Sequence, residues 1–298
     1  MRIAVTGANG LIGGEAVALL ADAHELLATG RGPCRLPRGA YRYVEAELGD
    51  GGAVERELRE FGAEAVLHAG ALTDVDECEG DAEAAWRVNV GGSAQVARAC
   101  RALGARLVAV STDYVFDGEA GPYGEDDPVR PCGVYGRTKL CGEEAVRLLV
   151  PGAAVVRVSA VFGGFPGTRS TFAAQVVEKL SRGEPVRAFS DQRLSPTLAS
   201  SAAKACVELL VETRHAGLLH ASGATVVDRV EFARRVAARF GLRGEIVPVR
   251  TAEAGLRAPR PLRGGLRVER AAGLLRHRPL ELDEALDRFQ AEWAARRR

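Results

Sequence analysis

The stretch VTGANGLIGGE, residues 5–15, decides the fold of this 298-residue chain. Gly7, Gly10 and Gly13 follow one another at three-residue spacing, between a short apolar run and a helical stretch. Glycine permits a tight turn, lets the backbone approach a pyrophosphate, and lets the helix pack closely on the strand. The helix N-terminus then presents its amides and its positive dipole end to phosphates. A plain strand-to-helix turn needs one glycine, so the stretch predicts a dinucleotide-binding loop.

Short apolar runs alternate with helical stretches through the first half of the chain. We expect strands at 2–7, 24–30, 41–48, 63–70, 106–112 and 153–163, and helices at 11–23, 52–62, 82–104 and 135–149. Strands that are apolar on both faces and separated by helices indicate a parallel sheet covered on both sides. The sequence therefore predicts an α/β fold built on a doubly wound, parallel, Rossmann-type sheet. Glycines are expected to interrupt the helix at 82–104.

The alternation loosens after about residue 157. Helices are expected near 169–182 and 228–240, and strands at 185–189, 217–223 and 245–250. We expect a dinucleotide-binding domain at 1–157, with 190–222 rejoining its sheet, and a smaller interleaved C-terminal substrate lobe at 158–189 and 223–298.

The bulk composition excludes several classes of protein. A hydrophobic fraction of 47% and a charged fraction of 27% are ordinary for a globular protein. A net charge of +1 gives no basic field for nucleic acid or an anionic membrane, and no apolar run is long enough to span a bilayer. The six cysteines form no C-x-x-C pair and show no metal-ligand spacing with histidine. We expect a cytoplasmic protein without a nucleic-acid or membrane partner and without a bound metal.

The end of the second expected strand bears on the choice of cofactor. NAD-specific proteins present an acid there to the ribose 2′-hydroxyl. This chain has ATGRG at 28–32, with no acid, and Arg31 suits the 2′-phosphate of NADP. Arginine is also the default cation of the chain, because only Lys139, Lys179 and Lys204 are lysine among 40 Lys and Arg. We expect NADPH as the cofactor, with NADH left open.

A lysine in so arginine-rich a chain draws attention to VYGRTKLCGEE, residues 134–144. Tyr135 and Lys139 are spaced i, i+4 and share one face of the expected helix. An ammonium favours the phenolate and moves the pKa of tyrosine toward the working range. A forked, planar guanidinium cannot place so compact a charge between a phenol and a ribose hydroxyl. The pair predicts acid–base chemistry beside a bound dinucleotide.

Two hydroxyls precede that helix, in VAVSTDYVFDG. Ser111 and Thr112 fall at the C-terminal end of the expected fifth strand, where ligands bind in open α/β sheets. A hydroxyl there can hydrogen-bond a substrate carbonyl and the oxyanion that develops from it. We favour this role for Thr112. For Ser111, a catalytic role and a simple turn-capping role are equally supported.

With these motifs assembled, the chain resembles the extended short-chain dehydrogenase/reductase superfamily over nearly its whole length. Within it, the chain is most similar to the dTDP-4-dehydrorhamnose reductases and related nucleotide-sugar ketoreductases. The matching stretches are TGANGLIG (6–13), LTDVDECE (72–79), STDYVFDG (111–118), YGRTKLCGE (135–143), SDQRLSPT (190–197) and RP at 260–261.

The resemblance implies that a hydride passes from NADPH to the C4 ketone of a nucleotide-linked deoxysugar. Tyr135 would donate the proton, Lys139 would lower its pKa and hold the nicotinamide ribose, and Thr112 would bond the substrate oxygen. Asn89 matches a family position near the cofactor. The expected cofactor-binding residues are Gly7, Asn9, Gly10, Leu11, Ile12, Gly13, Arg31, Leu48, Ala69, Gly70, Ala71, Asn89, Tyr135 and Lys139. The expected partner is a nucleotide-sugar substrate, and a homodimer is left open.

The chain also departs from the family pattern. Ala160 stands where those reductases usually carry an aromatic residue, and LRGGLR (262–267) differs where they usually carry a polar one. Both places are expected to touch the sugar nucleotide, so the sugar and the nucleotide stay unassigned. Two alternatives remain open: a nucleotide-sugar epimerase or dehydratase, and a non-catalytic NADP-binding protein like the methionine adenosyltransferase β subunit. A dehydratase usually needs an acidic pair after the threonine, whereas only Asp113 follows Thr112.

Overall fold

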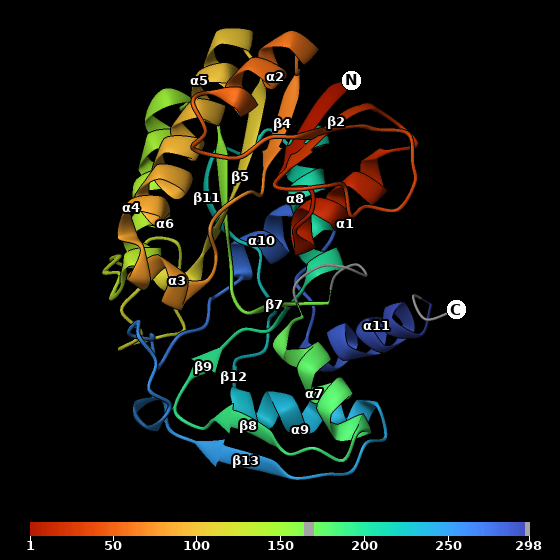
Figure 1. The fold of residues 1–298 in the computed structure, drawn as a ribbon, viewed down its shortest axis with the longest axis vertical. Coiled ribbons are helices and arrows are strands. Elements are labelled where there is room, and N and C mark those ends of the chain that lie inside the picture. The colour runs from red at the N-terminus through yellow and green to blue at the C-terminus, as the bar shows by residue number, and fades with distance from the viewer. Residues whose placement is uncertain (164–169, 296–298) are drawn as a thin grey trace.

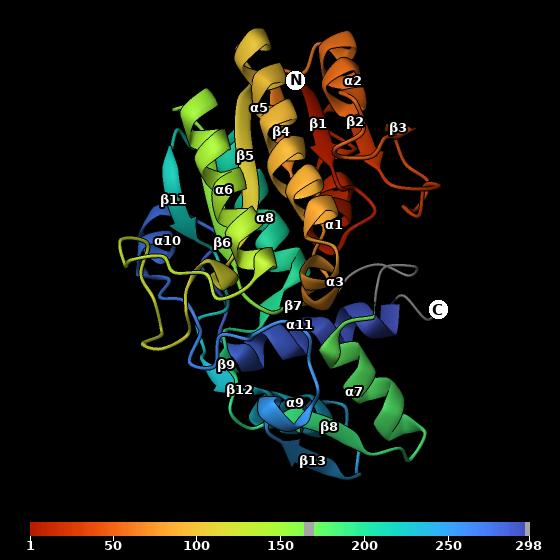
Figure 2. The same cartoon turned by 60° about the vertical axis from the view of Figure 1, so that its left-hand side comes forward.

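The computed structural model describes residues 1–163 and 170–295. Its main feature is a seven-stranded, all-parallel sheet in the order β11-β6-β5-β4-β1-β2-β3 (Figure 2). The strands are β1 (Arg2–Thr6), β2 (Glu25–Gly30), β3 (Arg42–Glu45), β4 (Ala65–His68), β5 (Arg106–Thr112), β6 (Ala154–Val158) and β11 (Gly217–His220). The order reverses between β1 and β4, so the predicted doubly wound parallel sheet is confirmed.

Helices cover both faces of this sheet (Figures 1 and 2). One face carries α1 (Leu11–Leu20) and α8 (Ala199–Val211), and the other carries α2 (Ala53–Phe61), α5 (Gly92–Leu103) and α6 (Val134–Leu149). Two separate hydrophobic cores therefore flank the sheet, and the strands between them are buried on both sides. The short helix α10 (Glu269–Leu274) packs beside β11.

A third core lies outside the sheet, at the bottom of Figure 1. It is formed by α7 (Phe172–Ser181), α9 (Arg229–Arg239) and α11 (Leu282–Ala295) with the parallel pair β8 (Val186–Phe189) and β13 (Ile246–Val249). Five phenylalanines and one tryptophan pack there, with ring centroids 5.2–6.2 Å apart. The expected helix near 169–182 begins at Phe172, and residue 169 lies outside the described part of the chain.

The expected sixth strand, 153–163, is wrong as a single element. It divides into β6 and the two-residue β7 (Val161–Phe162), which pairs with β10 (Thr197–Leu198) instead of the main sheet. The break falls at Ala160, whose φ of +43° is the left-handed conformation that a non-glycine residue adopts only at a cost. Tertiary hydrogen bonds hold this turn, since the Thr197 hydroxyl donates to the Ser159 carbonyl at 2.7 Å.

The helical region 82–104 also differs from expectation. Its glycines do not interrupt it: α4 (Ala82–Ala85) runs into a π-helix (Trp86–Gly91) and then into α5. A π-turn is wider than an α-turn and is frequent at functional sites. Here it surrounds Asn89, which is 1% exposed.

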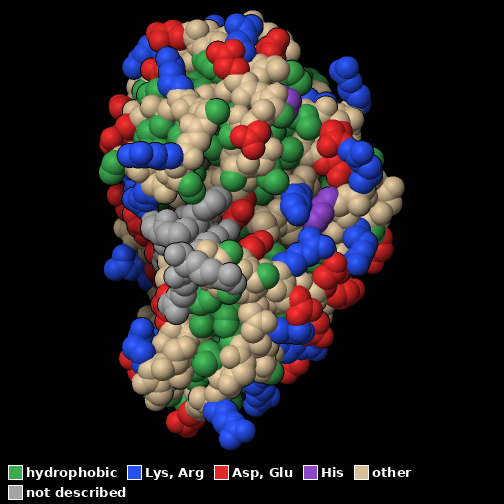
Figure 3. Space-filling model, turned by 90° about the vertical axis from the view of Figure 1, so that its right-hand side faces the viewer, with side chains coloured by type: hydrophobic (Ala, Val, Ile, Leu, Met, Phe, Trp, Pro, Cys, Tyr) green, Lys and Arg blue, Asp and Glu red, His purple; other side chains and the backbone are tan. Residues whose placement is uncertain are grey.

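The surface is mixed in charge. Figure 3 shows basic and acidic side chains interspersed over the face that it displays. No helix within residues 1–163 and 170–295 is long and apolar enough to cross a membrane.

Candidate functional site

A cavity of about 580 Å³ lies at the carboxyl ends of the sheet strands, where the strand order reverses. The expected site residues that line it are Gly7, Asn9, Gly10, Leu11, Ile12, Arg31, Leu48, Ala69, Gly70, Ala71, Thr112, Tyr135 and Lys139. Gly13 and Asn89 do not line it. One continuous cavity thus joins the glycine loop to the tyrosine–lysine pair.

The glycine-loop end of the cavity is built from backbone atoms in close approach. Gly7 has a φ of +70°, and a Cβ there would lie 2.4 Å from the Cα of Gly70 on the loop after β4. A Cβ on Gly13 would lie 2.3 Å from the carbonyl oxygen of Gly7. Gly13 therefore acts by letting α1 pack against the loop, which explains why it is absent from the cavity wall.

Asn9 organises the neighbouring loop after β2. Its amide donates to the carbonyls of Arg31 and Pro33 at 3.0 Å, and its carbonyl accepts from the backbone of Arg35 at 2.9 Å. Arg31 and Arg35 both line the cavity as a result. Sequence reasoning missed Arg35, because in an arginine-rich chain nothing marks it before the loop is folded.

The other end of the cavity is built from side chains. Thr112 ends β5, and its hydroxyl donates to the Asp113 carboxylate at 3.2 Å while accepting from the amide of Tyr114 at 3.2 Å. Tyr135, in the first turn of α6, is 8% exposed and packs edge-on against Tyr114 with ring centroids 5.5 Å apart. Ser111 is buried on the cavity wall, and its hydroxyl has no hydrogen-bond partner among the described residues.

The electrostatics of the tyrosine–lysine pair differ from the sequence-based expectation. Burial raises the pKa of Tyr135 above its ordinary value, while a hydrogen bond with Thr112 acts to lower it. The Lys139 ammonium donates to the Val110 carbonyl at 2.9 Å, and burial lowers its pKa to about 8. The influences on the Tyr135 pKa are burial, Thr112, and the charges of Asp113, Tyr114 and Cys78, so the lowering by Lys139 that the sequence predicts is not seen in this arrangement.

Two glycines let α6 pack closely against the backbone at Tyr114 and at Asn89. A Cβ on Gly136 would lie 2.1 Å from the carbonyl oxygen of Tyr114, and one on Gly142 would lie 2.7 Å from that of Asn89. Such approaches fix the height of the helix over β5, and with it the position of Tyr135.

Asn89 acts behind the cavity wall. Its side chain accepts from the Leu72 amide at 2.8 Å and donates to the Leu72 carbonyl at 3.1 Å and the Thr138 hydroxyl at 3.0 Å. It thereby ties the loop after β4 to α6, one residue before Lys139. Asn89 does not line the cavity, and its expected contact with the cofactor stays a prediction.

His68, at the end of β4, was missed by the sequence reasoning. It accepts from or donates to the Thr6 hydroxyl at 2.7 Å and the Ser93 hydroxyl at 3.1 Å, and Ser93 itself donates to the Asn89 carbonyl at 2.6 Å. Because the Ser93 hydroxyl donates its proton to Asn89, its oxygen can only accept from His68. His68 therefore donates from Nε2 to Ser93 and accepts at Nδ1 from Thr6. Burial lowers the pKa of His68 to about 3, so the ring is neutral near Lys139.

Asp113 is a further group that the expected site set did not include. Its carboxylate accepts from Ser159 at 2.5 Å and from Thr112, and burial raises its pKa to about 6. Its position directly after Thr112 could have marked Asp113 as a site residue. Its contact with Ser159 could not be predicted, because the two residues are 46 positions apart in the chain.

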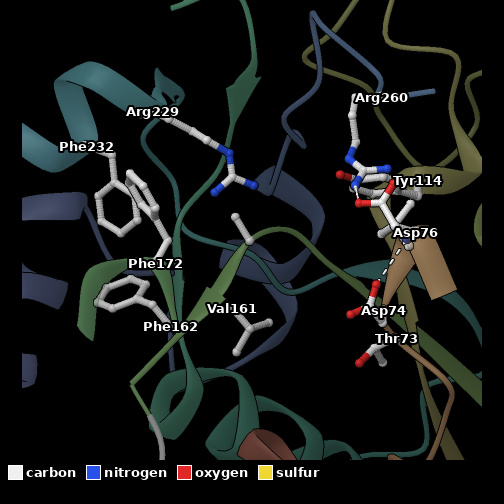
Figure 4. Close-up of a pocket in the computed structure, with 12 residues that line it drawn as sticks. Thr73, Asp74, Asp76, Tyr114, Val161, Phe162, Phe172, Arg229, Phe232 and Arg260 are labelled. Carbon is white, nitrogen blue, oxygen red and sulfur yellow. Dashed lines mark hydrogen bonds and ion pairs between the residues drawn. The ribbon is translucent and has the colours of Figure 1, made fainter. Parts of the chain in front are cut away.

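A second cavity, of about 490 Å³, adjoins the first. The residues that line both are Thr73, Asp74, Val75, Tyr114, Ala160 and Val161. Figure 4 shows Phe162, Phe172 and Phe232 on one side, Tyr114, Asp76 and Arg260 on the other, and Arg229 pointing between them.

Both arginines of this second cavity are held in place. Arg229 donates to Gln192 at 2.7 Å and its guanidinium lies 5.2 Å from the Phe172 ring centroid. Arg260 donates to Asp76 at 2.6 Å. The sequence did not mark Arg229, because α9 is brought to the cavity by the packing of the third core, which joins segments distant in the chain.

The two cavities together suit a dinucleotide beside a second charged ligand. Guanidinium groups match the geometry of phosphate oxygens, and aromatic faces accept planar rings. Within the described residues, no group of three or more His, Cys, Asp or Glu could hold a metal ion.

Comparison with known proteins gives the chain its relatives. Residues 1–294 match the model of the RmlD substrate binding domain. A dTDP-4-dehydrorhamnose reductase of Mycobacterium tuberculosis is 38% identical over 267 residues, which cover 87% of this chain and 82% of the relative. The methionine adenosyltransferase 2 subunit beta of Danio rerio is 31% identical, with 90% of this chain and 83% of the relative covered.

Solved structures agree with this grouping. The dTDP-4-dehydrorhamnose reductase of Bacillus anthracis, in complex with NADP, superposes with a TM-score of 0.86 at 26% identity, covering 98% of this chain and 99% of that one. MoeE5, in complex with UDP-glucose and NAD, superposes with a TM-score of 0.84 at 26% identity and covers 100% and 99% of the two chains.

Proposed function

The chain belongs to the RmlD substrate binding domain family, within the extended short-chain dehydrogenase/reductase superfamily, and from this premise we propose that it is an NADPH-dependent reductase of a nucleotide-linked 4-ketosugar. One observation carries the proposal: Thr112, Tyr135 and Lys139 line one end of a cavity whose other end is the glycine loop. The relatives named dTDP-4-dehydrorhamnose reductase, one of them bound to NADP, support the same activity in deoxysugar biosynthesis.

The chemistry follows from the groups at that end of the cavity. NADPH, when bound, supplies the hydride. On substrate binding the Thr112 hydroxyl would turn its one proton from Asp113 to the ketone oxygen and hold that oxygen near Tyr135. Tyr135 then donates its phenolic proton to the oxygen as it becomes an alcohol. The raised pKa of Tyr135 suits this direction, because the phenol stays protonated in its resting form. Lys139 supplies a fixed positive charge that stabilises the phenolate left behind.

We propose that the two cavities divide the ligands. The sheet domain, 1–157 with 190–222, would hold the dinucleotide, and the lobe formed by 158–189 and 223–298 would hold the sugar nucleotide, although residues 164–169 and 296–298 lie outside the described part. Arg229 and Arg260 are suited to the diphosphate and the phenylalanines near Arg229 to the base. The UDP-glucose bound by MoeE5 supports a ligand of this class.

Arg31 and Arg35 favour NADPH over NADH, because both line the cavity where the loop after β2 approaches the glycine loop. Both cofactors occur among the relatives, with NADP in the Bacillus anthracis reductase and NAD in MoeE5. The cytoplasmic location and the homodimer stay predictions from the sequence.

A second candidate is a non-catalytic role, favoured by the 31% identity to a methionine adenosyltransferase subunit. A dehydratase is disfavoured, because Asp113 is followed by Tyr114 rather than by a second acid. An epimerase keeps NAD tightly bound through its cycle, which fits poorly with Arg31 on the cavity wall.

Turnover separates these candidates. Purified protein is mixed with NADPH and a panel of nucleotide-linked 4-ketosugars, dTDP-4-dehydrorhamnose first, and the loss of NADPH absorbance is followed. The reductase proposal expects steady turnover that Tyr135→Phe lowers by about 10²-fold or more. NADPH binding without turnover on any ketosugar of the panel would favour the non-catalytic role.

A further inference from the structure

Three buried ionisable side chains follow one another along a single face of α6. Tyr135, Lys139 and Glu143 are spaced at i, i+4 and i+8, and their exposed fractions are 8%, 7% and 3%. The first two belong to the proposed reaction. Glu143 does not line the cavity, and the mechanism above makes no use of it.

Glu143 is paired with a buried arginine on the neighbouring strand. Arg157 of β6 donates from Nε and Nη2 to the two carboxylate oxygens at 3.0 and 2.7 Å, and each side chain is 2% exposed. The Arg157 guanidinium also lies 5.2 Å from the centroid of the Phe116 ring. This bidentate, walled-in geometry leaves the carboxylate little freedom to move.

Stability alone gives a weak reason for such a pair. Burying two charges costs several kcal/mol per ion, and apolar replacements of similar volume are often neutral or stabilising. The Nη1 atom of Arg157 is buried with no hydrogen-bond partner among the described residues, which adds to the cost. The carboxylate is therefore expected to act on another group nearby.

That group is Lys139, one turn earlier on α6. Burial lowers the pKa of Lys139, and the charge of Glu143 is the larger of the two influences that raise it. The other titratable groups around the ammonium are Cys78 of α3 (Val75–Gly80), His68 of β4 and Tyr135. His68 is neutral and Cys78 is a buried thiol with a raised pKa, so Glu143 is the carboxylate among them.

We propose that Glu143, held by Arg157, is a positioning residue that fixes the charge and the place of the Lys139 ammonium. Two interactions then hold α6 to adjacent strands. Lys139 donates a hydrogen bond to the Val110 carbonyl of β5, and Glu143 forms an ion pair with Arg157 of β6. The effect on catalysis depends on the proposed reductase function. The electrostatic coupling itself is a property of the protein without substrate.

The test replaces the pair without leaving an unpaired buried charge. Glu143→Gln/Arg157→Met removes both charges and keeps most of the volume, whereas Glu143→Asp keeps the carboxylate. Lysine labelled with ¹³C at Cε is titrated by NMR, and the three lysines of the chain give three signals. Lys139→Arg assigns its signal, while Lys179 and Lys204 serve as internal controls.

The proposal expects the Lys139 midpoint to fall by about one pH unit in the double variant, because Glu143 raises the pKa of Lys139 whereas Arg157, which is lost with it, is not among the influences on that pKa. In Glu143→Asp the Lys139 midpoint should fall by no more than about a third of that shift, and the midpoints of the control lysines should not change in either variant. If the double variant does not fold, Glu143→Gln/Arg157→Gln takes its place. In the reductase assay, the alkaline limb of the kcat/KM profile should move to lower pH in the same variant.

A Lys139 midpoint equal to that of the native protein in a folded, charge-free variant would overturn the proposal, because the pair would then be structural only. An equal fall in Glu143→Asp would also overturn it. These titrations need no substrate, so an absence of turnover in the native protein would count against the reductase function and leave this result standing.

Discussion

The two ends of the long cavity are built differently, one from backbone atoms and the other from side chains. The glycine-loop end is backbone in close approach, with Gly7 and Gly70 so near that a single Cβ would collide. The reaction end is a set of buried side chains whose pKa values depend on distant partners. A backbone site tolerates no added atom, while a side-chain site fails when a charge is removed or is moved from its place. The two ends should therefore fail in different ways when altered.

The largest effect on cofactor binding is expected at the glycine-loop end. Gly7→Ala places a methyl group 2.4 Å from the Gly70 Cα, at a φ of +70° that alanine disfavours. The loop must open to accommodate it, so we expect NADPH affinity to fall by about 10²-fold, measured by fluorescence titration. Gly91→Ala is the matched control, because no atom lies within 4 Å of its added Cβ. Native affinity in Gly7→Ala would refute the backbone account of this end.

A smaller effect on turnover is expected from Asp113→Asn at the reaction end. The amide keeps an acceptor for Thr112 but loses the charge, so kcat should fall by about tenfold in the ketosugar assay.

The same variant should gain stability at neutral pH. Burial raises the pKa of Asp113 to about 6, above its unfolded value, so ionising it weakens the fold as pH rises from about 4 to about 6. The variant is free of this penalty and should unfold at a higher temperature at pH 7, with a gain of ~1–3 kcal/mol that vanishes near pH 4. An equal gain at both pH values would contradict the assigned ionisation.

The smallest effect is expected at the rim of the glycine-loop end. Arg31→Ala removes one of two arginines on the cavity wall, and Arg35 remains, so the NADPH-to-NADH ratio of kcat/KM should fall by roughly three- to tenfold. Arg38→Ala, an exposed arginine of the same loop that does not line the cavity, serves as its control. Equal efficiency with both cofactors in the native protein would remove the basis for this prediction.

The two ends also differ in how far the sequence predicts them. Glycine spacing is local, so Gly7, Gly10 and Gly13 revealed the loop without a structure, and the i, i+4 spacing placed Tyr135 beside Lys139. The partners that set the charges at the reaction end are remote along the chain. Arg157 meets Glu143 only because β6 follows α6 back into the sheet, and no periodic pattern announces that contact.

The same reasoning explains two of the differences from the sequence-based expectations. The run at 153–163 is apolar enough for one strand, but bonds to Thr197 and Asp113 hold Ser159 in a turn and place Ala160 in a left-handed conformation. The pKa of Tyr135 depends on burial by elements from several parts of the chain, so the tyrosine–lysine spacing could not give its direction.

The most direct test of the account is the turnover of Lys139→Arg compared with Lys204→Arg, both assayed with NADPH and the ketosugar that the native protein reduces. Lys139 is buried and bonded to the Val110 carbonyl, whereas Lys204 is exposed on α8. We expect both variants to fold, Lys204→Arg to keep native activity, and Lys139→Arg to lose about 10²-fold in kcat, because a guanidinium cannot occupy the place of the ammonium. Native activity in folded Lys139→Arg would contradict the central claim that this lysine belongs to the reaction.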